Sequence, residues 1–285
     1  MLAGDNVRKV AIVGGNRIPF ARSNTAYFEV DNQEMLTAAL NGLVDRFKLH
    51  GERMGEVAAG AVMKHAKDFN LVRECVLGSK LAPETPAYDL QQACGTGLEA
   101  AILVANKIAL GQVDCAVAGG VDTTSDAPLG VNEQARKIFM EINRAKSNGD
   151  KLKQAVKLLN PKLMIPDIPK NGEPRTGLSM GEHCELMAKE WKISRKAQDE
   201  LAVASHKAAA QAYVDGFYDD LVFPYLGVER DNNLRPDTSV EKLANLKPAF
   251  DKENGTLTAA NSTPLTGGAS SVFLCSEEYA EANGL

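Results

Sequence analysis

Residues 87–110 read AYDLQQACGTGLEAAILVANKIAL, which is a strand-like run, a glycine-flanked turn and a helix that is apolar on nearly every side. The apolar side chains over 95–110 predict a buried helix. Cys94 stands where that helix begins, and free amide groups together with the positive end of the helix dipole favour a thiolate there. The same N–H groups can hold a developing oxyanion. This stretch therefore predicts an α/β domain with a candidate nucleophile at a helix start.

Strands and helices alternate on both sides of this stretch. We expect strands at 7–14, 56–63, 87–91 and 113–121, and helices at 31–49, 71–78 and 95–110. Such alternation is typical of a sheet covered by crossover helices. From about 130 to 250 the sequence changes to helices, charge and proline, with one strand-like run at 221–225, and a β pattern returns at 270–276. We therefore expect an α/β domain over 1–129, an inserted domain over 130–250 and a return to the first domain over 251–285.

The composition is that of an ordinary soluble globular protein. Its 285 residues are 44% apolar and 24% charged, and the net charge of -5 excludes long-range attraction to nucleic acid. No apolar stretch approaches the ~18 residues of a transmembrane helix, and no signal-peptide pattern is present. We therefore expect a cytoplasmic protein with at most peripheral membrane contact. The cysteines are odd in number and lack metal-like spacing, which predicts free thiols and no metal site; they are Cys75, Cys94, Cys115, Cys184 and Cys275.

Two other interpretations of the Cys94 turn are open from its residues alone. Cysteines are commonly buried, so Cys94 could be a small core residue. The turn also matches the dinucleotide fingerprint G-x-G-x-x-G/A from Gly95 to Ala100, with Asp122 some 20 residues further on, which predicts an NAD-binding Rossmann dehydrogenase. Against the second interpretation, the preceding strand ends in polar Gln91 and Gln92, and the turn follows the third expected strand instead of opening the domain.

Several segments, in order along the chain, resemble segments of the thiolases, the enzymes that make or cleave 3-ketoacyl-CoA. They are VAIVGGNRIPF at 10–20, the Cys94 region at 88–97, AGGVDTTS at 118–125, MGEHCE at 180–185, LKPAF at 246–250, GTLTAANS at 255–262 and GGA at 267–269. Together they cover nearly the whole chain. The resemblance implies a layered α-β-α thiolase-like N-terminal half with an inserted, mostly helical loop domain.

The resemblance also implies the roles of individual residues. Cys94 takes an acyl group from CoA as a thioester, and its backbone N–H contributes to an oxyanion hole. The substrate-binding residues that it implies are Ser179, Met180, Arg235, Ala259, Thr263 and Leu265, which surround the pantetheine and adenine parts of CoA. No cofactor or metal is implied, because coenzyme A thioesters are the substrates. The residues alone leave two alternatives open: Arg235 as a solvated loop charge, and Met180 as ordinary helix packing.

The sequence departs from the family pattern at three positions. The family usually has Asn at Gln91, Glu at Asp122 and Ala at Cys184, which suggests a divergent subfamily. The segment 131–169, with basic amphipathic helices, resembles the loop domain of the long-chain thiolases that pair with a hydratase/dehydrogenase subunit. The resemblance thus implies acyl-CoA and CoA as ligands, a homodimer, and contact of this segment with that subunit or with a membrane. A solvated helix face is the plain alternative.

Thiolases continue into a second half that carries an N-E-A-F segment, a G-H-P histidine and a C-x-G cysteine, and none of these occurs in this sequence. The histidine activates the nucleophile and the second cysteine moves the substrate proton. We therefore expect a truncated chain in which Cys94 is acylated slowly and carbon–carbon chemistry is impaired. The predicted function is acyl transfer in fatty-acid β-oxidation; a non-catalytic fragment that binds CoA or dimerises is the alternative.

Overall fold

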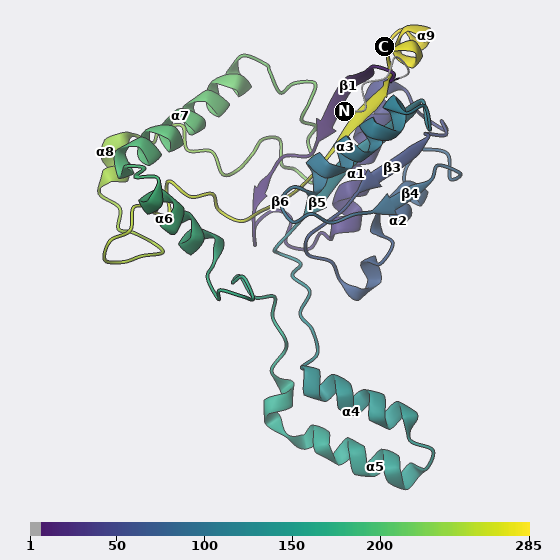
Figure 1. The fold of residues 1–285 in the computed structure, drawn as a ribbon, viewed down its shortest axis with the longest axis vertical. Coiled ribbons are helices and arrows are strands. Elements are labelled where there is room, and N and C mark those ends of the chain that lie inside the picture. Colours follow the sequence, from purple (N-terminus) through teal and green to yellow (C-terminus); the bar gives the residue numbers. More distant parts are fainter. Residues whose placement is uncertain (1–6) are drawn as a thin grey trace. The chain divides into compact units, whose positions relative to one another are not determined.

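The computed structural model describes residues 7–285. Residues 10–122 and 266–276 form a mixed sheet with helices on both faces (Figure 1). The sheet order is β1-β6-β5-β3-β4, with β2 beside β6. Strand β3 is parallel to β4 and β5, whereas β6 runs antiparallel to β1, β2 and β5. The strands are β1 (Val10–Arg17), β2 (Ala21–Arg22), β3 (Glu56–Ala59), β4 (Ala87–Asp89), β5 (Cys115–Asp122) and β6 (Thr266–Ser276).

Alternating side chains of the sheet bury two separate hydrophobic cores. Val57, Val117 and Phe273 point to one face, where they pack with helices α1 (Asn32–Phe47) and α2 (Leu71–Leu77). Their neighbours Ala58, Ala116 and Leu274 point to the other face, where they pack with α3 (Thr96–Ala109). Because side chains alternate along a strand, this pattern buries both faces of the sheet. The layered α-β-α fold that the sequence predicts is confirmed.

Helix α3 differs from the expectation that it is buried all round. Its residues Ala100, Val104 and Ile108 are fully buried against the sheet, but Leu98 is 70% exposed and Ile102 is 44% exposed. The sequence shows apolar side chains on every face, and the described residues supply a packing partner for only one of them. The prediction of complete burial is therefore wrong.

The strand predicted at 221–225 is also absent from the described residues. Only isolated bridges occur there, between Arg17 and Val222 and between Tyr225 and Val228. The segment pairs with the end of β1 through two hydrogen bonds, Arg17 N–H to the Leu221 carbonyl (2.9 Å) and Phe223 N–H to the Arg17 carbonyl (3.2 Å). It then turns, so no ladder forms. Strand β1 lies three residues later than predicted, because its partner β6 pairs with residues 10–17.

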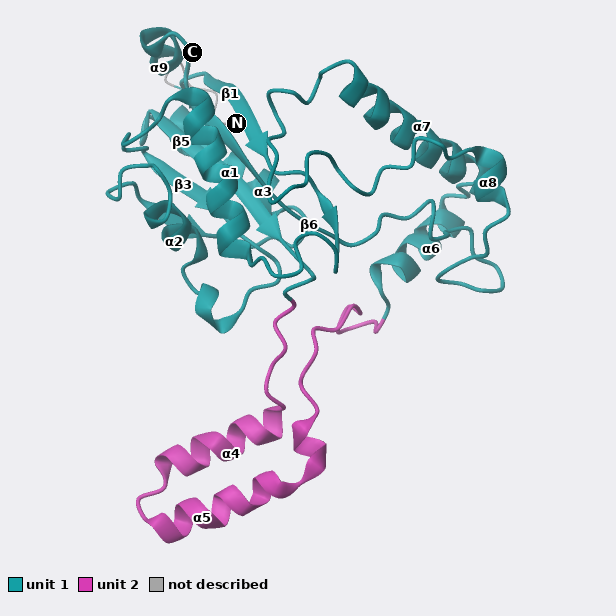
Figure 2. Cartoon of the chain, turned by 180° about the vertical axis from the view of Figure 1, so that it is seen from behind, with its two compact units in different colours: residues 1–126, 178–285 teal, residues 127–177 magenta. Residues whose placement is uncertain are grey.

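The chain divides into two compact units (Figure 2). One unit comprises the chain up to residue 126 together with residues 178–285, and it contains α6 (Met180–Glu190), α7 (Arg195–Val214), α8 (Val240–Ala244) and α9 (Glu277–Asn283). The other unit, residues 127–177, is a helical hairpin of α4 (Glu133–Arg144) and α5 (Asn148–Val156) followed by two short 3-10 turns. The three-segment division expected at 129/130 and 250/251 stays a prediction. Across residues 7–285, no helix is both long and apolar enough to cross a membrane.

Candidate active site

The turn that carries Cys94 joins the edge strand β4 to helix α3. Ala93 has a φ of 45°, in the left-handed region that costs energy for a residue with a Cβ. Hydrogen bonds close the turn, from the Gly95 N–H to the Gln92 carbonyl (2.9 Å) and from the Gln92 N–H to the Thr96 hydroxyl (2.9 Å). The buried Thr96 hydroxyl in turn donates to the Ala93 carbonyl (2.7 Å). These bonds hold Cys94 exposed at the surface.

Cys94 is exposed beside the N-terminus of α3. Among the described residues, its thiol has no hydrogen-bond partner, and no side chain caps the N-terminus of α3. The Thr96 N–H donates to the Ala93 carbonyl (3.2 Å), so Gly97 and Leu98 supply the N–H groups that an anion at this helix start could use. Two other thiols, Cys75 and Cys275, are buried. Burial raises the pKa of Cys75 to about 12 and also raises the pKa of Cys275. Buried thiols of this kind are poor nucleophiles, whereas Cys94 is accessible.

Asp122 and Gln91 hold a loop next to this turn. The Asp122 carboxylate accepts the Val62 N–H (2.8 Å) and the Met63 N–H (3.0 Å), and the Gln91 amide donates to the Val62 carbonyl (3.3 Å). Burial raises the pKa of Asp122, and the two N–H bonds oppose that rise. The two bonds give Asp122 a structural role in holding residues 62–63, which the dinucleotide interpretation does not predict.

Ser179 and Met180 begin helix α6. The Ser179 hydroxyl accepts the Glu182 N–H (3.3 Å), and the Glu182 carboxylate accepts the Ser179 N–H (2.7 Å), which makes a capping box. Met180 is 64% exposed. A Cβ on Gly181 would come within 2.1 Å of the Phe250 ring, so only glycine fits there. The M-G and L-K-P-A-F segments that the sequence singled out thus pack against each other.

A buried carboxylate fixes the start of the 256–265 loop, which carries three of the predicted CoA-binding residues. Glu185, on α6, is 2% exposed. It accepts the Thr256 N–H (2.8 Å), the Leu257 N–H (2.6 Å) and the Thr256 hydroxyl (3.3 Å). Hydrogen bonds to a charged carboxylate are strong, so this glutamate fixes the start of the loop against α6.

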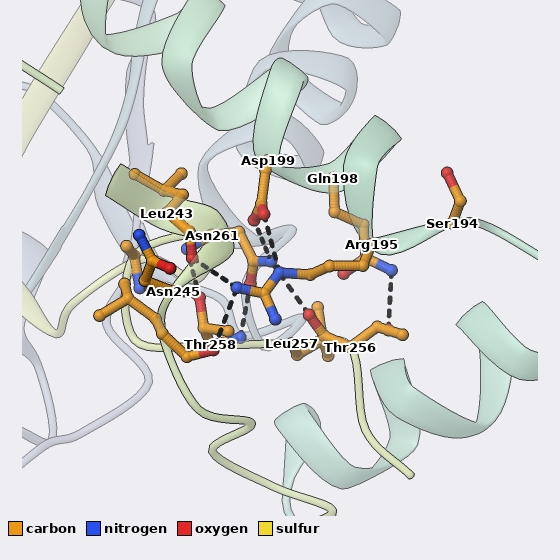
Figure 3. A network of polar contacts seen from close by, with 12 residues as sticks. Ser194, Arg195, Gln198, Asp199, Leu243, Asn245, Thr256, Leu257, Thr258 and Asn261 are labelled. Carbon is orange, nitrogen blue, oxygen red and sulfur yellow. Dashed lines mark hydrogen bonds and ion pairs between the residues drawn. The ribbon is translucent and has the colours of Figure 1, made fainter. Parts of the chain in front are cut away.

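A second network ties the same loop to helix α7 (Figure 3). The Asp199 carboxylate, which is buried, accepts the Arg195 Nε–H (2.8 Å) and the Asn261 amide (2.9 Å). The side-chain oxygen Oδ1 of Asn261 accepts the Thr258 N–H (2.6 Å). Gln198 donates to the Thr256 hydroxyl (2.9 Å). Glu185 on α6 and Asp199 on α7, both buried, therefore hold the loop from two helices.

Two cavities adjoin this loop. One, of about 180 Å³, is lined by Arg235, Ala259 and His206, among others. The other, of about 450 Å³, is lined by Thr263 and Cys184, among others, and shares His206 with the first. The structure thus brings Arg235, Ala259 and Thr263 to adjacent cavities. Four predicted site residues, all of them described, lie outside both linings: Cys94, Ser179, Met180 and Leu265.

The sequence analysis missed the residues that hold the loop and complete the cavities. Glu185 and Asn261 lie inside two of the segments that resemble the thiolases, MGEHCE and GTLTAANS. Their polar side chains within these segments could have pointed to a structural role. Asp199 and His206 lie on α7 with no local pattern around them. Within residues 7–285, no cluster of three or more His, Cys, Asp or Glu side chains could hold a metal ion.

Comparison with known proteins identifies the family of this arrangement. Residues 10–278 match the model of the thiolase N-terminal domain. The chain is 40% identical to the 3-ketoacyl-CoA thiolases of Shewanella baltica and Pectobacterium atrosepticum, over 97% of its own length and 64% of theirs. It therefore spans 64% of the length of these relatives.

Solved structures of the family share the fold. The acetyl-CoA acetyltransferase of Bacillus anthracis superposes with a TM-score of 0.81 at 26% identity, over 99% of this chain and 69% of that one. The human mitochondrial 3-ketoacyl-CoA thiolase in complex with CoA superposes with a TM-score of 0.79 over 98% and 67%, and at 23% identity it bears on the fold alone. The chain belongs to the thiolase family and has the fold of its N-terminal domain.

Proposed function

We propose that this chain carries out acyl transfer between CoA and a 3-ketoacyl-CoA through a thioester on Cys94. In the half-reaction with an acyl-CoA, the Cys94 thiolate attacks the carbonyl carbon of its thioester, and the carbonyl oxygen becomes an oxyanion beside the N-terminus of α3. The carbonyl then re-forms as the CoA thiolate leaves and takes up a proton, so that the acyl group remains on Cys94. The observation that carries this proposal is an exposed thiol on a strained turn at an uncapped helix start, in a chain of the thiolase family.

The other predicted site residues receive roles in the same proposal. Thr263, Ala259 and Leu265 would hold pantetheine on the loop that Glu185 and Asp199 fix. Arg235 would contact the adenine end of CoA, and the exposed Met180, with Ser179 beside it, would line the acyl channel. The support is that Arg235, Ala259 and Thr263 adjoin two neighbouring cavities.

The direct test is to incubate the protein with acetyl-CoA or acetoacetyl-CoA and to map acylated cysteines by mass spectrometry. We expect an acetyl thioester on Cys94, formed slowly because the sequence contains no G-H-P histidine to activate the thiol. Cys184 is a matched control within the same chain, since it is partly exposed but lies inside helix α6.

Two results would contradict the proposal. Acylation of Cys94 no faster than that of Cys184 would show a merely accessible thiol. Acylation that persists at equal yield after Cys94→Ser, at any other residue, would show that the turn does not direct the reaction. CoA binding without any acylation would favour a non-catalytic fragment.

Several finer assignments belong to the same proposal. The relatives are 3-ketoacyl-CoA thiolases, which supports a role in fatty-acid β-oxidation, and the reaction requires a reduced Cys94, which supports the cytoplasm. We propose a homodimer and, through residues 127–177, contact with a hydratase/dehydrogenase subunit or with an anionic membrane surface. This segment has ten Lys and Arg against five Asp and Glu, whereas the remainder of the chain has 22 against 32. Exposed apolar side chains interrupt its basic residues, including Leu152, Leu159 and Met164.

A further inference from the structure

Two side chains hold the peptide that joins Val62 to Met63, shortly after strand β3 and beside the Cys94 turn. The Asp122 carboxylate accepts the N–H of Met63 (3.0 Å), and the Gln91 amide donates to the carbonyl of Val62 (3.3 Å). The N–H and the C=O of a trans peptide point in opposite directions, and the described chain contains no cis peptide. Gln91 and Asp122 therefore hold one peptide plane from opposite sides.

The sheet fixes the space between these two side chains. Gln91 follows β4 and Asp122 ends β5, and β3 lies between the two strands and pairs with both of them. Strand pairing therefore sets the distance between the backbones at 91 and 122. Within that distance, the two side chains and the held peptide must together have the right length. A longer side chain at one position requires a shorter one at the other.

The two departures from the thiolase pattern at these positions are opposite in length. Gln91 has one methylene more than the asparagine that the family usually has, and Asp122 has one fewer than the usual glutamate. The summed length of the two side chains is therefore unchanged, and each position keeps its chemical group, an amide at 91 and a carboxylate at 122. Two unrelated substitutions have no physical reason to compensate in this way, whereas two side chains that share one peptide do.

The loop that contains this peptide packs against both ends of the Cys94 turn. Gly60 lies so close that a Cβ there would come within 1.9 Å of the Leu90 carbonyl and 3.0 Å of the Thr96 side chain. Thr96 is the residue whose hydroxyl closes the turn, and Gln91 lies just before it. A displacement of the loop therefore reaches the backbone on both sides of Cys94.

We propose that Gln91 and Asp122 are a pair of positioning residues for Cys94, in which only the sum of the two side-chain lengths is constrained. The inference rests on the proposed function, because its effect is on acyl transfer at Cys94. By fixing the loop against the turn, the pair keeps the N–H groups at the start of α3 in place for the oxyanion. Both side chains act through the backbone and not on the reacting atoms.

The test is a double-mutant cycle of Gln91→Asn and Asp122→Glu. For each variant, the rate of Cys94 acylation by acetyl-CoA is divided by the rate of its alkylation by iodoacetamide, which needs an accessible thiolate but no oxyanion site. A single replacement breaks the length match and loses about one hydrogen bond, so we expect either one to lower this ratio about fivefold. The double variant restores the length sum and should return the ratio to within about twofold of wild type. Gln112→Asn, the same change on an exposed glutamine just beyond α3, should leave the ratio unchanged.

Hydrogen exchange of the Val62 and Met63 amides measures the hold on the loop without any acyl transfer. We expect each single variant to lose protection there and the double variant to regain it. Single-variant effects that simply multiply in the double variant would overturn the pair. An unchanged ratio of acylation to alkylation in single variants that have lost protection would overturn the positioning of Cys94.

The inference and the proposed function fail in different ways. A wild-type protein without acylation at Cys94 would refute the proposed function. The exchange data would then decide the length match by themselves, because protection regained in the double variant supports it and protection lost further overturns it.

Discussion

Ala93 shows how a single residue can place a nucleophile at a cost in stability. Its φ of 45° is one that glycine adopts freely and alanine does not. Five non-glycine residues of the described chain have positive φ, and Ala93 is the one next to the candidate nucleophile. Strain at such a position is a common property of functional turns, where surrounding bonds over-determine the backbone. The hydrogen bonds through Gln92 and Thr96 perform that task here.

Replacing Ala93 by glycine should therefore stabilise the protein. We expect Ala93→Gly to raise the free energy of unfolding by about 0.5–1 kcal/mol, because the left-handed conformation costs alanine roughly 1–2 kcal/mol and the greater entropy of unfolded glycine offsets part of the gain. Urea denaturation measures the change. The matched control is Ala208→Gly on the exposed side of α7, where glycine should destabilise by about 0.5–1 kcal/mol. Equal signs for the two variants would contradict the argument.

At the residue scale, the sequence predicted Cys94 well because its turn is local. The glycines, the strand before it and the helix after it all lie within 24 residues. The contact of Asp122 with residues 62 and 63 could not be found in this way, since it joins segments about 60 residues apart. Asp199 likewise acquires its partner Asn261 from 62 residues further on. Contacts of this range depend on the whole fold, and no local pattern records them.

At the element scale, the turn over 251–255 shows how a single carboxylate orders the segment between α8 and the 256–265 loop. Asp251 pairs with Lys189 on α6 and accepts the N–H groups of Glu253 (3.1 Å) and Asn254 (3.0 Å). The hydrogen bond from Lys189 is the main reason why the pKa of Asp251 falls to about 2 from an ordinary value of 3.8, and the two N–H groups lower it further. The charged form is the one that holds the turn.

Acid should therefore remove the contribution of Asp251. A carboxyl group with a lowered pKa in the folded protein stabilises it above the unfolded value, and that stabilisation disappears as the pH falls through the folded value. We expect Asp251→Asn to lower the urea midpoint at pH 5–7, and the difference from wild type to shrink from about pH 4 down to pH 2. Glu253→Gln, on the same turn and without an ion pair among the described residues, is the control. A difference that stays constant down to pH 2 would exclude this cause.

The residues at which strands begin and end depended on the strands they pair with more than on the local sequence pattern. Helix α1 was predictable because Asp31 and Glu34 form a capping box at its start and apolar residues recur along one face. Strand β1 shifted because only its pairing with β6 decides which residues count as strand. The apolar run over 221–225 resembles a strand, but among the described residues it forms only isolated bridges, one to Arg17 at the end of β1 and one between Tyr225 and Val228. Periodicity therefore indicated that an element exists, and pairing decided its extent.

At the scale of the whole molecule, the unequal distribution of charge is the property most open to experiment. Residues 127–177 carry a net charge of +5 within a chain of -5. The sequence predicted a basic helical segment in this region, and the structure has the hairpin of α4 and α5 there. Basic residues mixed with exposed leucines suit the surface of an anionic membrane, where each Lys or Arg contributes about 1 kcal/mol.

Binding to vesicles would test this assignment. We expect the protein to sediment with vesicles that contain phosphatidylserine, and less with phosphatidylcholine alone or at high salt. Lys151 and Lys153 are exposed and form no ion pair within the described residues, so their double replacement by glutamine should weaken binding roughly tenfold or more. The same replacement of Lys247 and Lys252, exposed in the other unit, is the control. Equal effects of the two double variants would show a response to net charge alone, and no sedimentation would leave the protein-subunit alternative.

The central position of strand β6 governs how this chain can fold while it is being made. Residues 266–276 lie between β1 and β5, yet the ribosome adds them more than 140 residues after β5 is complete. At synthesis rates of 5–20 residues per second, that gap lasts roughly 7–30 s. During this time β1 and β5 present unpaired backbone edges, which are prone to join the strands of other chains. Strands β1 and β5 therefore cannot join into one sheet until β6 has been synthesised.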